Sequence, residues 1–357
     1  MTPKPLLARF VLVASAVCAP LCAHTPLFTD GPAFGGSEVF SEGMNPLANS
    51  ARYGQASTGY YFTYLDGDQR SKDINSILDN TMSANPAAAS AALAQLANSP
   101  WALRTRAYGF TALKKGGALG LTREELNGIL ATPDLAAFNL GSGLAGNQST
   151  LAARRAVVDR LNLGGGGPLE KGSTTALGVS LRVERWEMGQ TTVPFNPPPA
   201  FGGADTNLLG GTGTSAQSWN LALDAGIVLE MAQGVRLGLS ADQLNAKHLW
   251  DVYLQPQFRA GIQLDLGQQT KLSIEGDINS VERMPLPVKQ QSASASLRFA
   301  LSQAAAFLVG AEQRKLAGVS QTFIGGTLQI RTDSILLSVG FNAGQDRPMK
   351  GATFMVN

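Results

Sequence analysis

Apolar and polar residues alternate along much of the second half of the chain. Between Leu221 and Met231 every second residue is apolar, and most of the residues between them are small or charged. Successive side chains on a β-strand point to opposite faces, so this pattern predicts a strand with one apolar and one polar face. Residues 219–343 are therefore predicted to form a series of amphipathic strands. The alternation recurs in residues 235–242, 257–266, 271–278, 294–301 and 335–342.

Strand length and turn length favour a membrane barrel over a soluble sandwich, whose strands alternate in the same way. The predicted strands span about ten residues, the length that a tilted membrane strand needs. Short turns alternate with longer loops, as in bacterial outer-membrane barrels, whose short turns face the periplasm. We predict an all-β fold, an antiparallel transmembrane β-barrel. The short turns are residues 232–234, 267–269, 302–304 and 332–333, and the longer loops are 243–255, 279–291, 314–319 and 343–349.

The N-terminal half combines strand patterns with helical ones. Residues 57–65 are rich in aromatic residues and are predicted to form a strand with interface anchors. Residues 104–113 and 117–121 are predicted to form a hairpin that turns at 114–117. Helical insertions are predicted over residues 71–98, after the capping-box pair Thr122 and Glu125, after Pro133 at a first helical position, and over 149–161.

Strand parity then sets the expected orientation and count. With the C-terminus in the periplasm, about ten strands follow Thr174 and the long loops lie outside. The segments 66–103 and 122–173 are then expected to start and end on the periplasmic side, which requires one more strand near residues 35–41. The total is about fourteen strands. The helices are expected either to lie beneath the barrel or to plug its lumen.

The first residues have the pattern of a signal peptide. Lys4 and Arg9 precede a short apolar run, residues 10–17, and Ala23 closes an acceptable cleavage site that leaves His24 first. We expect a signal peptide over 1–23, an N-terminal segment with a plug-like region, first strands and helical insertions over 24–173, and the remaining strands of the same barrel over 174–357. This localises the protein to the bacterial outer membrane.

Composition and motifs exclude several classes of function. Charged residues make up only 15% of the chain and the net charge is +2, so no basic patch for nucleic acid is expected. Both cysteines lie in the predicted signal peptide, and the two histidines of the chain are His24 and His248. We expect no enzyme, no metal site and no cofactor, and we interpret His248 as a solvated loop residue, with a catalytic role as the weaker alternative.

Nine charged residues share the polar face of the predicted strands and are expected to line the lumen. They form either a lattice of ion pairs that stiffens the wall or a polar pathway for solutes. Trp186, Trp219, Trp250 and Tyr253 are expected to be interface anchors. The nine lumen candidates are Asp224, Glu230, Arg236, Arg259, Asp265, Lys271, Glu275, Asp277 and Arg298.

Three segments resemble a family of outer-membrane proteins. Asn45-Pro46-Leu47-Ala48, followed by Tyr53-Gly54, is similar to the Asn-Pro-Ala segment of FadL-type and TraF-like proteins, although Leu47 replaces the usual Ala. Residues 235–244 and 256–266 resemble their recurrent strands. The resemblance implies a barrel in which Asn45 and Pro46 belong to a plug near the mature N-terminus.

FadL-type members move hydrophobic molecules across the outer membrane, so the resemblance implies a barrel that passes or binds small hydrophobic molecules. The alternative function is that of a structural or assembly component of a conjugal-transfer or secretion system. A soluble secreted β-protein is the weakest of the three hypotheses. The expected partners are outer-membrane lipid, a small hydrophobic ligand and periplasmic proteins, with no nucleic acid.

Overall fold

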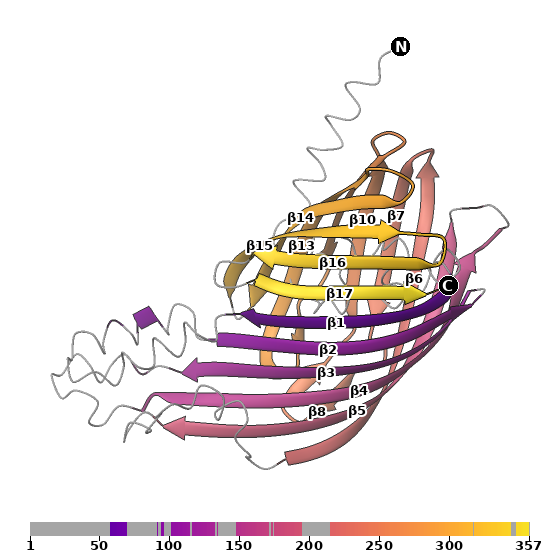
Figure 1. Ribbon diagram of the computed structural model, residues 1–357. Helices are drawn as coiled ribbons and strands as arrows, with labels where there is room; N and C mark the ends of the chain where they lie inside the picture. Colours follow the sequence, from indigo (N-terminus) through magenta and orange to yellow (C-terminus); the bar gives the residue numbers. More distant parts are fainter. Residues whose placement is uncertain are drawn as a thin grey trace.

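The described part of the chain is almost entirely β-strand (Figure 1). Of the predicted helix over 71–98, only Ala91, Ala94 and Gln95 are described, and they are helical. No helix among the described residues is long and apolar enough to cross a membrane. The predicted signal peptide and the plug motif lie outside the described residues. The computed structural model describes residues 58–69, 91, 94–95, 101–114, 116–132, 134, 148–170, 173, 175–194, 215–316, 318–343 and 348–356.

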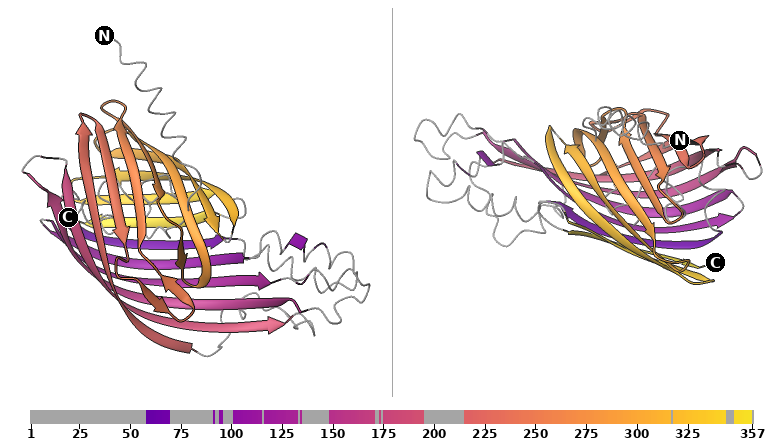
Figure 2. Two further views of the ribbon diagram at one scale, coloured as in Figure 1. Left: turned by 180° about the vertical axis from the view of Figure 1, so that it is seen from behind. Right: turned by 90° about the horizontal axis from the view of Figure 1, so that it is seen from above.

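All but two of the described strands form one antiparallel sheet that closes into a barrel (Figure 2). The sheet has 15 strands, and β12 (Val281–Arg283) pairs with β13 alone among them, which leaves fourteen in the wall. Pairing of β1 with β17 and of β11 with β13 completes the ring. The wall strands are β1 (Gly59–Gln69), β2 (Trp101–Lys114), β3 (Gly117–Thr132), β4 (Thr150–Pro168), β5 (Ala176–Pro194), β6 (Ser215–Ala232), β7 (Val235–Asp242), β10 (Gln257–Asp265), β11 (Thr270–Asp277), β13 (Leu286–Ala300), β14 (Ala305–Leu316), β15 (Val319–Arg331), β16 (Ile335–Ala343) and β17 (Pro348–Val356).

The wall is apolar outside and polar inside, the reverse of a water-soluble protein. On β6, Leu221 and Leu223 are 52% and 43% exposed, whereas Ala222 and Asp224 between them are 0% and 8% exposed. Aromatic and aliphatic side chains are exposed in the same way on the neighbouring strands, and serine, threonine and charged side chains are buried. Such a surface is stable only where lipid covers it, so the chain is a transmembrane barrel, as the alternation predicts.

The predicted count is confirmed, but one strand in it was misplaced. Fourteen described strands form the wall, ten of them after Thr174. The proposed strand near residues 35–41 lies outside the described residues, and the wall closes between β1 and β17 without it. Its place in the count is taken by β4, which sequence analysis assigned to a helix over 149–161.

Two of the predicted helices are wrong. Thr122 and Glu125, assigned to a capping box, lie in the middle of β3, and residues 150–161 belong to β4. The reason is that β3 carries apolar outward residues only as far as Leu121. Beyond it Arg123 faces outward and Glu124 faces the lumen, so both faces are polar and the alternation disappears. The hairpin of β2 and β3 is confirmed, with longer strands than predicted.

These two strands reverse the expected placing of the N-terminal segments. The turns at 115–116, 169–175, 233–234, 266–269, 301–304 and 332–334 share one end of the barrel, here called the short-turn end. The strands that flank residues 70–100 and 133–149 end at the opposite, long-loop end, together with those that flank 195–214 and 243–256. The expectation that 66–103 and 122–173 start and end at the short-turn end is therefore wrong.

Candidate functional site in the barrel lumen

A small hairpin between β7 and β10 folds into the lumen at the long-loop end. It consists of β8 (Lys247–Leu249) and β9 (Val252–Leu254), joined by Trp250 and Asp251. Trp250 has a φ of 56°, which a bulky residue adopts only where its surroundings hold it there. Apolar side chains of the hairpin are buried, with Leu249 1% and Val252 0% exposed. Sequence analysis assigned these residues to an external loop.

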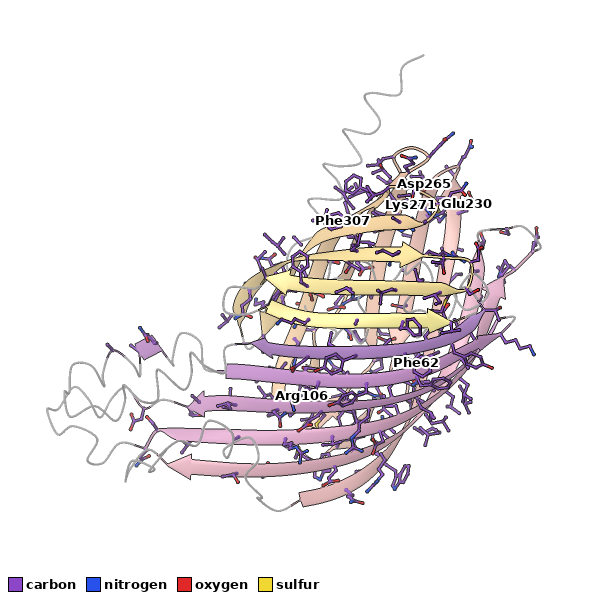
Figure 3. All side chains as sticks on the ribbon, viewed as in Figure 1. Phe62, Arg106, Glu230, Asp265, Lys271 and Phe307 are labelled. Atoms are coloured by element: carbon purple, nitrogen blue, oxygen red, sulfur yellow. The ribbon has the colours of Figure 1, made fainter. Side chains whose placement is uncertain are left out.

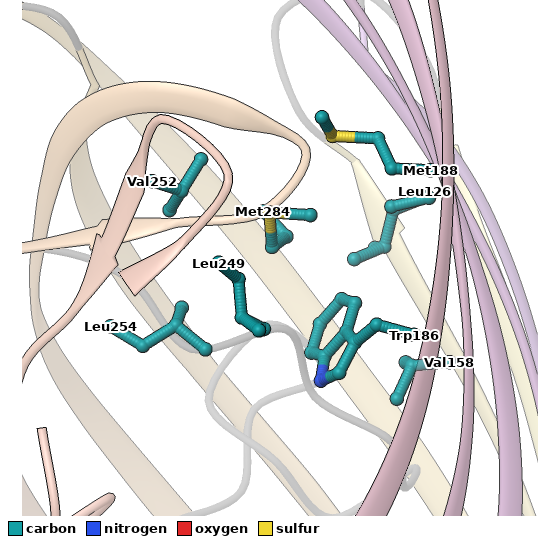
Figure 4. Packing of buried hydrophobic residues seen from close by; sticks show 9 residues of the cluster. Leu126, Val158, Trp186, Met188, Leu249, Val252, Leu254 and Met284 are labelled. Carbon is teal, nitrogen blue, oxygen red and sulfur yellow. The ribbon is translucent and has the colours of Figure 1, made fainter. Parts of the chain in front are cut away.

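The hairpin packs against an apolar patch on the inner wall (Figure 4). Trp186 and Met188 on β5 are 4% and 5% exposed and point into the lumen, where Trp186 faces Leu249 of the hairpin. Trp250 covers the edge of the cluster. The prediction of Trp186 as an interface anchor is therefore wrong, whereas Trp219 does face outward and is 63% exposed. The buried cluster comprises Leu126, Ala156, Val158, Trp186, Met188, Leu249, Val252, Leu254 and Met284.

Polar contacts hold the hairpin against the wall. Arg154 on β4 donates two hydrogen bonds to Asp251 at the tip, from Nη1 to Oδ1 (2.8 Å) and from Nη2 to Oδ2 (2.5 Å). These bonds lower the pKa of Asp251 below its ordinary value, against a smaller opposing effect of burial. On β9 the Tyr253 amide donates to Glu282 Oε2 (2.9 Å). Charge-assisted pairs of this kind fix a side chain both in position and in orientation.

The connection into the hairpin also follows the wall. The Leu223 amide on β6 donates to Asn245 Oδ1 (2.8 Å), and the Asn245 side-chain amide donates to the Leu221 carbonyl. The Lys247 ammonium donates to the Trp219 carbonyl. These contacts anchor the base of the hairpin, so its tip and its base are held independently.

A layer of buried charges lies next to the hairpin, on the side of the short-turn end. Arg160 on β4 contacts Glu124 Oε2 (2.6 Å) and Glu184 Oε1 (3.0 Å), and its guanidinium lies 5.5 Å from the centre of the Trp186 ring. Arg182 pairs with Asp224 (2.9 Å). Charges removed from water in this way are tolerated only when they are paired. Except for Asp224, these residues were not among the predicted lumen residues, because they lie before residues 219–343, the range whose alternation predicts a polar inner face.

A second charged cluster collects three of the predicted residues. Arg259 contacts Asp277 Oδ1 (2.9 Å) and Glu275 Oε1 (3.4 Å), and all three side chains are buried. Gln257 and Ser292 donate further hydrogen bonds to Asp277. The cluster joins β10, β11 and β13, so it connects the two strands of the closing seam between β11 and β13.

The other predicted lumen residues lie toward the short-turn end (Figure 3). Arg236 pairs with Asp265 (3.2 Å). Lys271 is the register partner of both Asp265 and Arg298, and Glu230 is exposed. The nine residues are thus divided between both ends of the lumen, and their role as a solute pathway stays a prediction.

A small cavity separates the hairpin from the charged layer. Its volume is about 60 Å³, and its walls include Glu124, Arg182, Leu254 and Met284. A cavity holds a water molecule once its volume reaches about 10–15 Å³ and binds benzene at about 150 Å³, so this one lies between the two sizes. With the hairpin in this position the space admits water but no aromatic molecule.

Other candidate chemistry is not assembled in the described residues. His248 lies exposed on β8 and stacks on Tyr253, with ring centres 4.5 Å apart. Among the described residues, no three His, Cys, Asp or Glu side chains are placed to hold a metal ion. Asn45, Pro46 and His24 lie outside the described residues.

Comparison with solved structures identifies barrels of the same fold. The Pseudomonas putida toluene transporter TodX superposes with a TM-score of 0.52 at 10% identity, over 93% of this chain and 98% of that one. The monoaromatic hydrocarbon channel CymD gives 0.50 at 10% identity, over 93% of each chain. The chain shares the fold of these channels. No protein-family model matches it, and no curated protein does.

The likeness extends to architecture only, because the identity is low. TodX and CymD are FadL-like barrels, so the expected resemblance to FadL-type proteins holds at the level of the fold. The comparisons contain nothing that bears on the TraF-like group.

Proposed function

We propose that the protein is a bacterial outer-membrane channel that binds and passes small hydrophobic molecules, and that the hairpin β8–β9 is its gate. The observation that carries the proposal is the apolar patch inside an otherwise polar lumen. Leu126, Val158, Trp186 and Met188 supply the patch from the wall, and the hairpin covers it. A lumen used only by water-soluble molecules is polar throughout and has no need of such a surface.

In the closed position the hairpin covers the apolar patch to which we propose that a hydrophobic ligand binds. Burial of Leu249, Val252 and Leu254 stabilises the closed position by up to about 1.5–3 kcal/mol for each side chain. When the hairpin withdraws, the patch loses these contacts, and an apolar molecule restores them. A sugar cannot, because its hydroxyl groups find few hydrogen-bond partners on this part of the wall.

The location and orientation follow from the same features. The apolar outer face requires a membrane, and barrels of this kind place short turns in the periplasm and long loops outside. The hairpin then closes the external mouth, where cargo arrives. TodX, a toluene transporter, and CymD, a monoaromatic hydrocarbon channel, have the same fold, which supports small hydrophobic molecules as the cargo.

Uptake by cells tests the proposal. Cells that express the protein are compared with cells that carry an empty vector, using radiolabelled toluene and radiolabelled glucose. We expect faster uptake of toluene only, and slower uptake when Trp186→Ser and Met188→Ser make the patch polar. The matched control is Ser218→Ala on the neighbouring strand, outside the cluster. Equal toluene uptake with and without the protein would leave the assembly role as the better hypothesis.

A further inference from the structure

The outer wall carries a groove that the lumen site does not use. It is a shallow, open groove of about 810 Å³ that crosses the outer face from β1 to β6. Phe62, Phe110, Leu121, Leu161 and Val183 form its apolar floor. Phe62 and Leu121 are about half exposed, so the floor is an open surface at which lipid chains lie.

Aromatic contacts shape one side of the floor. The rings of Phe62 and Phe110 are 5.2 Å apart, and Tyr60 stacks on Phe110 at 6.1 Å. Tyr64 and Tyr108 lie 5.8 Å apart one row closer to the long-loop end. Rings held against each other in this way form a rigid surface, which loses little conformational entropy when a flexible chain lies on it.

A row of charges borders the floor toward the long-loop end. Arg123, Asp159 and Arg185 are direct register neighbours on β3, β4 and β5, and Trp219 follows on β6. Asp159 accepts a hydrogen bond from Arg123 (3.0 Å) and lies 4.0 Å from Arg185. Arg160 also borders the groove but pairs with Glu124 and Glu184 on the lumen side. The outward charges of the groove therefore sum to +1.

We propose that this groove binds one phosphorylated membrane lipid. An acyl chain lies on the aromatic and aliphatic floor, and the phosphate lies against the guanidinium groups of Arg123 and Arg185. Arginine binds phosphate through two parallel N–H groups, and Asp159 holds both guanidinium groups in place while it neutralises only one of them. Trp219 and Tyr108 stand at the same level, where aromatic residues meet lipid headgroups.

The neighbouring charges show why the site is specific to this groove. One row closer to the long-loop end, Glu125 and Glu187 face outward, and Arg155 from the row beyond them pairs with Glu125 (2.9 Å). None of these three side chains borders the apolar floor. A phosphate placed there would meet two carboxylates and no surface for its acyl chain.

Native mass spectrometry of the purified, detergent-solubilised protein tests the proposal. The probes are diphosphoryl lipid A, the same lipid without its phosphates, and inorganic phosphate. We expect wild type to retain diphosphoryl lipid A, with affinity about tenfold higher than for the dephosphorylated lipid, and to retain no inorganic phosphate. Retention of both lipids to the same degree would overturn the role of the arginines.

Substitutions distinguish lipid binding in the groove from attraction of the lipid by net charge. The double substitution Arg123→Gln and Arg185→Gln is expected to lower the affinity for diphosphoryl lipid A about tenfold. Arg155→Gln, which removes an outward cation beside the groove, is expected to leave it unchanged. Heat-modifiable gel migration checks that each variant is folded. An equal loss in the Arg155 variant would show that net charge alone attracts the lipid, and an unchanged double variant would also refute the proposal.

Discussion

Removing the charge at the tip of the lumen hairpin should loosen the gate. Asp251→Asn keeps the shape of the side chain but removes the charge that accepts both hydrogen bonds from Arg154. The Asp251 side chain is 50% exposed, so solvent screening reduces the contribution of the pair, whereas Arg154 is only 12% exposed. We estimate a loss of about 1–2 kcal/mol, which raises the open fraction of the hairpin about 5- to 30-fold.

Cysteine accessibility measures that fraction directly. Val158 lies beneath the hairpin and is 0% exposed, and the only cysteines of the chain, Cys18 and Cys22, lie in the predicted signal peptide. A Val158→Cys protein is labelled with a maleimide when the hairpin opens. The labelling rate is expected to rise about 5- to 30-fold when Asp251→Asn is added.

The matched control is Asp159→Asn, the same substitution in an exposed ion pair on the outer wall. It is expected to leave the labelling rate unchanged. If Asp251→Asn also leaves it unchanged, the Arg154–Asp251 pair does not hold the gate. If both variants raise it equally, the barrel has loosened as a whole, and the reasoning about the hairpin is again refuted.

Three further outcomes follow from the same contacts. Because its pKa is lowered in the folded protein, Asp251 contributes its stabilisation above an ordinary carboxyl pKa of about 4 and loses it as the pH falls through the lowered value. The rate of maleimide labelling beneath the hairpin, divided at each pH by the rate for a fully exposed cysteine variant to correct for the thiolate fraction, should be constant from pH 7 to 5 and rise below about pH 4. Gly128→Val should displace the start of β13, since a Cβ at residue 128 would lie 2.8 Å from the side chains of Leu286 and Pro285. A cost of about 1–3 kcal/mol should appear as a lower thermal midpoint, whereas Gly189→Val, with open space around it, should change little. Arg160→Met leaves Glu124 without its buried cation and leaves Glu184 with only the more distant Arg182 (3.8 Å). It should lower the free energy of unfolding by about 3–5 kcal/mol, measured by urea denaturation, and an unchanged midpoint would show that water reaches this layer.

Strands were predictable from the sequence where lipid lies on one side and a polar lumen on the other. This holds for β6 from Trp219 onward and for β7, β10, β11 and β16, whose outward residues are almost all apolar. It fails for the parts of β3 and β4 that extend toward the long-loop end, because the outer face there carries Arg123, Glu125 and Asp159. Without an apolar outer face, apolar and polar residues no longer alternate at every second position. The spacing of the apolar residues that remain then resembles that of a helix.

The gate could have been suspected from one irregularity. On β5 the inward positions run from Arg182 and Glu184 to Trp186 and Met188, so apolar residues occur where the lumen should be polar. Such residues need an apolar cover, and the loop at 243–255 contains one in Leu249, Val252 and Leu254. The contact between this loop and β5 cannot be predicted from the sequence, because it depends on how far the hairpin bends inward between β7 and β10.

The seam between β1 and β17 makes completion of the wall a late event in folding. It pairs Tyr60 with Val356, the most distant partners along the described chain, and contacts of this kind form slowly. Until they form, the sheet has two free edges that can join another chain. Substitutions along this seam should therefore increase misassembly during synthesis more than they change the permeability of barrels that have already closed.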